Sequence, residues 1–360
     1  MEDPHAGRQG IAGRGGAQSA ATPAISDDAR SDLILTAEYA GPSRGHELLV
    51  WIVCDPKHDV SEFELSENRM AQPLTPRRSR RDLRACFAVI EWQSDVMDYL
   101  PHFHREIQAF QTATRRAADA DEAALVPSCP GWSVSDLILH LGRVHRHVTR
   151  VIGDRLTERP DIADLGFLGL PADHEGWPTP EQAPNRGPIP AGLVDWFAEG
   201  ASALEVQFRS TSPGEAMWTW SRERTAGFWL RTQTIEAAVH RWDAENAIGT
   251  AQPVEAELAA DAIGQNFEVM APTRRAWKQA PPGSGERFRF RQTDGANDWT
   301  VCFDSDDVRL VEVAEPCDVE SAGTASDLML FLWQRIPAGR LDVSGDESVL
   351  NRYFTLVPPL

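Results

Sequence analysis

Cysteine is scarce and scattered in this sequence of 360 residues. The five cysteines, no two of which form a CxxC pair, are Cys54, Cys86, Cys129, Cys302 and Cys317. Such an odd and dispersed set predicts neither a disulfide framework nor a cysteine-based zinc site. It favours a reducing cytoplasm as the location of the protein.

Long apolar runs are also missing. The longest one in the early part of the chain, residues 48–54, is far shorter than the roughly 20 residues that span a bilayer. The N-terminus lacks the basic segment followed by an apolar one that is typical of a signal peptide. The sequence contains no internal repeat and none of the patterns GxGxxG, GxxxxGK[ST] and HExxH, so the sites that those motifs build are not predicted.

Positive charge is in deficit, with 35 Lys and Arg against 54 Asp and Glu and a net charge of −19. A chain this acidic is repelled by polyanions, which argues against nucleic acid or an anionic membrane as a general partner. The hydrophobic share of 42% is enough for packed cores, and the length allows two domains and a tail.

Residues 1–96 differ from the rest of the chain. They begin with a stretch rich in Gly, Ala, Ser and Pro that has no sustained period, which predicts disorder. The basic run at residues 76–84 is compatible with a nucleic-acid arm, although a solvated linker fits an acidic chain better. A well-patterned helix starts abruptly at Met97. Residues 1–96 are therefore either a disordered extension or a mis-assigned one, with Met97 as the true start.

Four helices are predicted in residues 97–250, with apolar residues at helical spacing over 97–119, 133–156, 191–209 and 225–249. The second helix has a clear start, because Ser133 and Asp136 have the spacing of a capping box. Gly249 suits the left-handed residue that follows a helix. A long Pro- and Gly-rich connection separates the second helix from the third. This order is typical of a four-helix bundle.

The pattern changes in residues 251–360. A helix is predicted over 254–270, followed by alternating segments at 287–292, 299–303 and 308–313 that indicate an antiparallel sheet. Two more helices are predicted over 325–336 and 346–354. We therefore expect a mainly helical protein in which a bundle is followed by a small α+β domain.

Three residues in the bundle have the chemistry of a metal site. Glu236 and His240 lie one turn apart beside an apolar stripe, and His140 interrupts the apolar face of the second helix. Two imidazoles and a carboxylate suit Zn²⁺ and leave a fourth position open. The alternatives are a surface Glu–His pair and a core histidine bonded to a neighbour. We expect His145 and His147, near several arginines, to be largely solvated.

The segments SCPGWSVSDLILHLGRVHRH and TIEAAVHRWDAENAIG resemble the mycothiol-dependent maleylpyruvate isomerase family, and GTASDLMLFLWQRIP is similar to the C-terminal helix of that family. The resemblance runs from about residue 97 to near the C-terminus and implies a DinB-like four-helix bundle joined to a small α+β domain. It also implies that His140, Glu236 and His240 bind a divalent metal, usually zinc, and that Arg335 matches a catalytic arginine.

The resemblance implies an enzyme that uses mycothiol as its thiol cofactor. A thiol bound at the open metal position would be deprotonated and become a nucleophile. In an isomerase the thiolate would add to a cis double bond, which would rotate before elimination; in an S-transferase the adduct would be released. Arg335 or Arg143 would hold a substrate carboxylate, and Asp243 would orient His240 or an arginine. For Asp243 the alternative is a surface charge.

Two other functions stay open at this stage. The first is a DinB-like hydrolase in which the metal activates water. The second is a non-catalytic metal- or small-molecule-binding protein, for which Gln233 is a possible fourth ligand. For the thiol-using enzyme the expected partners are a low-molecular-weight thiol and a small substrate, for which a carboxylate and a double bond suit the predicted chemistry. We expect a cytoplasmic monomer or homodimer.

Overall fold

The computed structural model describes residues 97–161, 165–312 and 315–359. The predictions for residues 1–96, including a start at Met97, lie outside this part of the chain. Within the described residues, no helix has both the length and the apolar composition that crossing a membrane requires.

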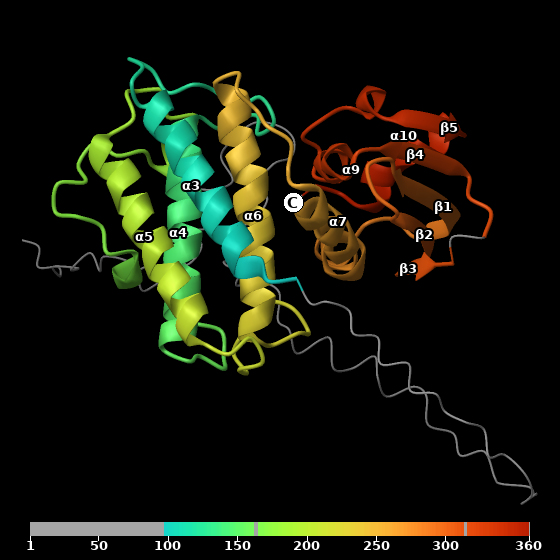
Figure 1. Cartoon of the computed structure of the whole chain (residues 1–360), viewed down its shortest axis with the longest axis horizontal. Helices are drawn as coiled ribbons and strands as arrows, with labels where there is room; N and C mark the ends of the chain where they lie inside the picture. Colours follow the sequence, from blue (N-terminus) through green and yellow to red (C-terminus); the bar gives the residue numbers. More distant parts are fainter. Residues whose placement is uncertain (1–96, 162–164, 313–314, 360) are drawn as a thin grey trace, which may run out of the picture.

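The first half of the described chain forms the predicted four-helix bundle (Figure 1). Its helices are α3 (Tyr99–Ala117), α4 (Val134–Gly153), α5 (Ala191–Ser210) and α6 (Ala226–Ala247). Helix α3 packs on α6, and α4 packs on α5. The connection between α4 and α5 contains two short 3-10 turns, η3 (Leu165–Leu168) and η4 (Pro180–Gln182). The predicted bounds of the helices agree with these to within a few residues.

The start of α4 is fixed by the predicted capping box. The Ser133 side chain accepts from the backbone N–H of Asp136, and the Ser133 N–H donates to Asp136 Oδ2 at 2.8 Å. The Asn185 N–H from the long connection donates to the same carboxylate oxygen at 3.0 Å. These bonds satisfy backbone donors that a helix start leaves free. They also set the rotation of α4 and so the direction in which its side chains project.

Helix α6 is the central element of the protein because it belongs to two cores. Thr225 caps its start, and Gly249 follows its end with a φ of 70°, as the sequence predicts. Ala237 and Ala244 pack inside the bundle, whereas Ile235 and Val239 pack against the second half of the chain. The apolar residues of this helix are therefore divided between the two cores, and Ile235 and Val239 face the C-terminal one.

The remaining described residues, 251–312 and 315–359, form the predicted small α+β unit, which we call the C-terminal lobe (Figure 1). Its helices are α7 (Ala256–Gln265), α8 (Ala271–Trp277), α9 (Ala325–Leu332) and α10 (Glu347–Leu356), with a π turn η5 (Asn266–Met270) and a 3-10 turn η6 (Ala338–Arg340). Its strands are β1 (Gly283–Gln292), β2 (Asp298–Ser305), β3 (Asp307–Val311), β4 (Val319–Gly323) and β5 (Asp342–Gly345). We propose that the division between the two units falls near residue 250.

The sheet has the order β3-β2-β1-β4-β5. Its pairs are antiparallel except for β1 and β4, which run parallel. The prediction of an antiparallel sheet is thus correct for three of these four pairs. Strands β4 and β5 were not predicted, because VESAG and DVSG are short and lack a clear alternation of apolar and polar residues.

Two helices of the C-terminal lobe end differently from the prediction. The helix predicted to stop at Met270 continues through the π turn into α8, although Pro272 follows in its first turn. The helix predicted to reach Ile336 ends at Leu332, because Gln334 adopts a left-handed conformation with a φ of 61°. The backbone N–H of Arg335 then donates to the Leu330 carbonyl at 2.7 Å. This turn directs the chain back toward the bundle.

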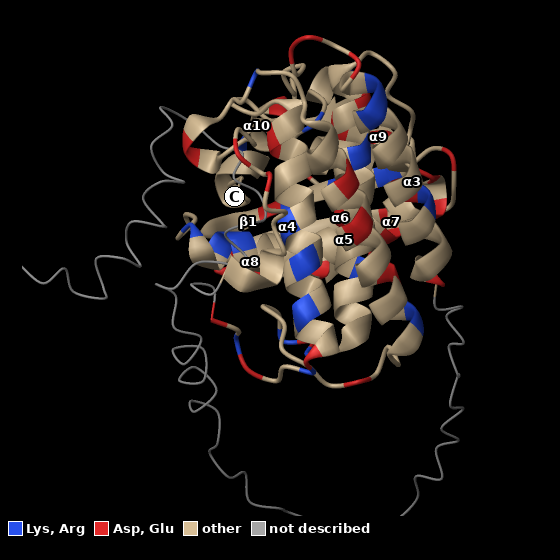
Figure 2. Ribbon diagram, turned by 90° about the vertical axis from the view of Figure 1, so that its left-hand side faces the viewer, with Lys and Arg blue, Asp and Glu red and all other residues tan. Residues whose placement is uncertain are grey.

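Acidic and basic residues are interspersed over the helices on the face that Figure 2 shows. Among the described residues several ion pairs lie in the interior, and one of them joins α6 to α3. Arg241 of α6 donates from Nε to Glu106 of α3 at 2.8 Å, and both side chains are almost fully buried. Arg241 also bonds to Glu245 and to the Gln252 carbonyl, so the C-terminal end of α6 is tied to α3 and to the segment that follows.

Candidate metal site and the buried network beside it

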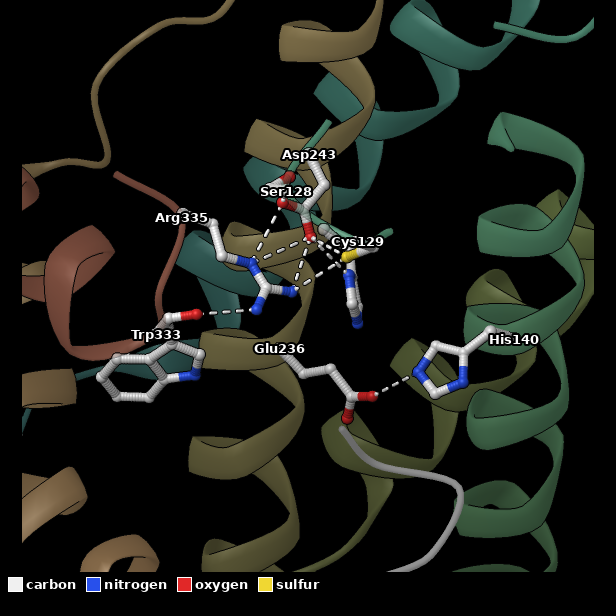
Figure 3. A network of polar contacts seen from close by, with 8 residues as sticks. Ser128, Cys129, His140, Glu236, Asp243, Trp333 and Arg335 are labelled. Atoms are coloured by element: carbon white, nitrogen blue, oxygen red, sulfur yellow. Dashed lines mark hydrogen bonds and ion pairs between the residues drawn. The ribbon is translucent and has the colours of Figure 1, made fainter. Parts of the chain in front are cut away.

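The structure brings His140, Glu236 and His240 together between α4 and α6. Figure 3 shows the His140 and Glu236 side chains pointing toward each other. His140 Nε2 lies 3.2 Å from Glu236 Oε1, and one potential ligand atom from each of the three residues lies within 4.8 Å of the others. All three side chains are buried. The alternative of a surface Glu–His pair is therefore wrong. A buried group of two imidazoles and a carboxylate is a donor set that suits Zn²⁺.

Two imidazole nitrogens of this group have no hydrogen-bond partner among the described residues. They are His140 Nδ1 and His240 Nε2. A buried polar atom that is left without a partner costs about 1–3 kcal/mol. The donor set therefore fits a cation that would take up such a lone pair. Gln233, considered above as a fourth ligand, instead donates from Nε2 to Glu236 Oε2 at 2.9 Å.

Aromatic and imidazole rings shield this group. The Trp132 ring lies 5.0 Å from the His140 ring and 6.5 Å from the His240 ring, measured between centroids. The two histidine rings lie 5.1 Å apart, edge to face. Burial lowers the pKa of His140, although its contact with Glu236 acts in the opposite direction. His140 is thus held in the neutral form, which is the form that binds metals.

A second buried group, centred on Asp243, adjoins the first. The His240 Nδ1 atom lies 3.0 Å from Asp243 Oδ2. Arg335 of the C-terminal lobe donates to the same oxygen from Nη2 at 2.8 Å. Figure 3 shows the Arg335 guanidinium facing the Asp243 carboxylate. The alternative of a surface charge for Asp243 is wrong, since its side chain is fully buried.

Asp243 stays ionised in this environment. Burial alone would raise its pKa, but the charge of Arg335 and the contact with His240 outweigh burial and hold the pKa well below its usual range. An ionised carboxylate accepts the proton of His240 Nδ1. Nε2 of the same ring is then left as a free acceptor, which is the tautomer that a metal site requires.

Arg335 reaches Asp243 because α9 ends early and its last turn leads back to the bundle. Its guanidinium also donates to the Trp333 carbonyl at 2.8 Å and to Cys129 Sγ at 3.4 Å. The side chain is buried, so Arg335 is not a surface residue at the end of α9. These hydrogen bonds place the Arg335 guanidinium on the side of the Asp243 carboxylate, which in turn contacts His240.

Arg143 lies one turn after His140 on α4 and is half-buried. It is close enough for its charge to contribute to the lowered pKa of His140. Among the described residues it has no hydrogen-bonding or ion-pairing partner, in contrast to Arg335. It is therefore the better placed of the two arginines to receive an anionic group next to the candidate metal site.

Ser128 and Cys129, which were not predicted as site residues from the sequence, also belong to the Asp243 group. The Ser128 hydroxyl donates to Asp243 Oδ1 at 2.6 Å, and the Cys129 thiol lies 3.6 Å from Asp243 Oδ2. Burial and the Asp243 charge raise the pKa of the Cys129 thiol to about 12, so it stays protonated. The one feature of the sequence that could have indicated these two residues is their position in the turn directly before the capped start of α4.

The expectation that His145 and His147 are solvated is wrong, because both are buried. The His145 ring packs against Phe103 and Phe197, and neither of its nitrogens has a partner among the described residues. Burial lowers the pKa of each histidine to about 3. The nearby arginines suggested a polar face, but α4 is covered on nearly all sides.

A cleft of about 490 Å³ lies between the bundle and the C-terminal lobe. Ser128 and Arg335 line it, together with Asn246, Gln334 and residues of α9 and α10. None of His140, Glu236 and His240 is among its lining residues. The Asp243 group thus lies between this cleft and the candidate metal site.

Comparison with known proteins gives a consistent result. Residues 103–245 match the model of the mycothiol maleylpyruvate isomerase N-terminal domain, and residues 257–352 match the model of the C-terminal domain of the same proteins. Together the two matches span about two thirds of the chain. No curated protein sequence matches.

Two solved structures are similar to this one. Both are mycothiol-dependent maleylpyruvate isomerase, and one of them carries a histidine-to-alanine mutation. They share 13% and 14% sequence identity with this chain, and each alignment covers 68% of this chain and 91% of the other, with a TM-score of 0.45.

Proposed function

Because the chain belongs to the mycothiol maleylpyruvate isomerase family, we propose that it is a mycothiol-using isomerase that depends on a divalent metal. The observation that carries the metal part of the proposal is the buried group of His140, Glu236 and His240, in which His240 Nε2 has no partner among the described residues. An S-transferase that uses the same thiol is the close variant of this function.

In this proposal His140, Glu236 and His240 hold the metal, and zinc is the ion that the donor set suits best. When bound, such a metal lowers the pKa of a coordinating thiol and so supplies a thiolate at neutral pH. Gln233 fixes the Glu236 carboxylate through its hydrogen bond to Oε2. Trp132 covers the histidines and limits the access of water.

Asp243 and Arg335 were predicted as catalytic residues, but in this proposal Asp243 positions His240 and Arg335 positions Asp243. Asp243 accepts from His240 Nδ1 and keeps Nε2 free for the metal. Arg335 keeps Asp243 ionised and in place, since the guanidinium donates to both of its carboxylate oxygens. The Arg335 guanidinium already donates hydrogen bonds to Asp243, Trp333 and Cys129, which supports this role over direct contact with a substrate.

Arg143 is proposed to bind a carboxylate of the substrate or of the thiol cofactor. Its lack of a protein partner among the described residues and its place one turn from His140 support this role. A guanidinium forms charge-assisted, often bidentate hydrogen bonds with a carboxylate. Such a bond would orient an anionic substrate relative to the metal.

The metal is tested first, by elemental analysis of the purified full chain. We expect near-stoichiometric zinc in the wild type and its loss in His140→Ala and in Glu236→Gln. His174→Ala, a substitution of an exposed histidine, is the control and should retain the metal. A wild type that carries no metal, and binds none when zinc is added, would contradict the proposal.

The reaction is tested with a cis-unsaturated carboxylic acid, assayed with and without mycothiol. Formation of the trans acid only in the presence of the thiol supports an isomerase, and a stable thiol adduct supports the transferase variant. Thiol-independent turnover by water would support the metal-dependent hydrolase instead. A metal-loaded protein without turnover in any of these assays would favour the non-catalytic binding protein.

A further inference from the structure

We propose that the Ser128 hydroxyl is a positioning residue for the metal site, acting through Asp243. The inference rests on the proposed function, because it assumes that His140, Glu236 and His240 hold a metal. It concerns a residue outside that ligand set. Ser128 lies in the turn before α4 and donates to Asp243 Oδ1 at 2.6 Å.

Arg335 contacts both oxygens of the Asp243 carboxylate, but His240 contacts only Oδ2 and Ser128 only Oδ1. Oδ2 is shared by His240 Nδ1 at 3.0 Å and Arg335 Nη2 at 2.8 Å. Oδ1 accepts from the Ser128 hydroxyl and, at 3.1 Å, from Arg335 Nε. A rotation of the carboxylate would move Oδ2 away from the His240 ring. The bond to Ser128 opposes that rotation at the other oxygen.

Ser128 differs from Arg335 in the part of the chain that carries it. Arg335 belongs to the C-terminal lobe, so its hold on Asp243 depends on how that lobe sits on the bundle. Ser128 belongs to the bundle, as do the helices that carry the three candidate ligands. It therefore ties the carboxylate to the same structural unit as the candidate metal site.

The turn that carries Ser128 is closed by backbone hydrogen bonds. The Val126 N–H donates to the Trp132 carbonyl at 2.9 Å, and the Trp132 N–H donates to the Cys129 carbonyl at 3.0 Å. Prolines at 127 and 130 further restrict the backbone. The capped start of α4 follows at Ser133. The hydroxyl is thus held in a fixed place, which a positioning residue requires.

A purely structural role for Ser128 predicts a loss of stability without a specific effect on the metal. The two roles are separated by measuring zinc affinity, through competition with a chelator, and the visible spectrum of the Co²⁺-substituted protein. The full chain is used as wild type, Ser128→Ala and Ser128→Thr. The matched control is Ser326→Ala, because Ser326 is a buried serine whose oxygen accepts from the Val254 N–H at 2.9 Å, within the C-terminal lobe.

We expect Ser128→Ala to bind zinc about 10-fold more weakly than the wild type. Losing a residue that supports a metal ligand lowers metal affinity about 10- to 100-fold, and this value is the lower end of that range. We also expect a changed Co²⁺ spectrum. Ser128→Thr keeps the hydroxyl and should restore affinity toward the wild type. Ser326→Ala should lose stability but keep wild-type zinc affinity. If Ser128→Ala does not fold, Ser128→Cys, which donates a weaker hydrogen bond, should show an intermediate loss.

The result that overturns the inference is wild-type zinc affinity in a folded Ser128→Ala or Ser128→Cys protein, or an equal loss in Ser326→Ala. In both cases the wild type still binds zinc, so the proposed function stands. A wild type that binds no zinc removes the proposed metal site itself and the role of Ser128 with it. The two failures are therefore distinguishable.

Discussion

Arg335 and Asp243 form an ion pair in which neither side chain is exposed to solvent, with Arg335 Nη2 2.8 Å from Asp243 Oδ2. The pair joins the C-terminal lobe to α6 at a position one turn beyond His240 and two turns beyond Glu236. The carboxylate that positions His240 is thus the same one that receives the C-terminal lobe. Damage to the contact between the two units should therefore affect the candidate metal site.

Breaking this pair should be costly. Asp243→Asn or Arg335→Met leaves one buried charge or donor group without its partner, which costs about 3–5 kcal/mol. We expect a drop of this size in the free energy of unfolding, measured by urea denaturation. Arg186→Met, in a pair with Glu122 whose side chains are both exposed, should cost less than about 1 kcal/mol. Equal effects at the two sites would contradict the importance given to burial.

Arg143→Gln should weaken substrate binding without removing the metal. A hydrogen bond to a charged group contributes about 1.5–3 kcal/mol, so KM for an anionic substrate should rise about 10-fold or more. Arg146→Gln, one turn further along α4, is the control, because Arg146 already donates to the Trp196 carbonyl at 2.8 Å. Unchanged KM in Arg143→Gln, measured in steady-state assays, would rule out the proposed carboxylate contact.

The stability of the protein should fall in mild acid because of His145. Burial holds the pKa of His145 at about 3 in the folded chain, below the value of about 6.5 in an unfolded chain. Above pH 6.5 both states bind no proton at this site, and stability is at its full value. As the pH falls from 6.5 toward 3, the unfolded state binds the proton first and stability is lost.

The expected loss from this histidine is about 2 kcal/mol at pH 5, at about 1.4 kcal/mol for each pH unit below 6.5. His145→Leu should make the unfolding free energy less dependent on pH between 6.5 and 4, as measured by urea denaturation across that range. His174→Leu, on the exposed connection between α4 and α5, is the control. An unchanged pH dependence in His145→Leu would show that His145 does not cause the acid sensitivity.

Neighbouring arginines on α8 should respond in opposite ways to substitution by methionine. Arg274 is buried, and its Nε and Nη2 atoms have no partner among the described residues. Burial lowers its pKa to about 10. Arg274→Met removes this cost and should raise the midpoint of thermal unfolding. A lowered midpoint would point to an anion that pairs with Arg274 in solution.

Arg275 is the matched comparison. Its guanidinium donates to the carbonyls of Leu356 and Ser305, each at 2.8 Å, and so ties α8 to α10 and to the end of β2. Arg275→Met leaves those carbonyls without a donor and should lower the midpoint of unfolding. The two variants change the same residue type one position apart, so differences in composition cannot explain opposite shifts.

Much of the fold could be predicted because its determinants are local. The capping box at Ser133 and the glycine after α6 act within one turn of the helix, so a single sequence displays them. Strand β4 could not be predicted in this way. It is held by parallel pairing with β1, some thirty residues earlier in the chain, and VESAG carries no pattern of its own.

The residues of the candidate site also differ in whether a local sequence pattern indicates them. His140, Glu236 and His240 could be predicted because two of them share a helix face and the third interrupts an apolar face. Ser128 could not, since a serine in a turn looks the same whether or not a carboxylate from another helix receives its hydrogen bond. The burial of His145 was missed for a related reason: it depends on the elements that cover α4, which the period of α4 does not reveal.

The dual packing of α6 has a practical consequence for protein engineering. A truncated chain that stops near residue 250 would keep all three candidate ligands, but it would leave Ile235, Ala238 and Val239 without the C-terminal core that covers them. Such a fragment would expose an apolar patch along its last helix and tend to self-associate. A minimal version of the bundle would need polar replacements at these three positions before it could be produced on its own.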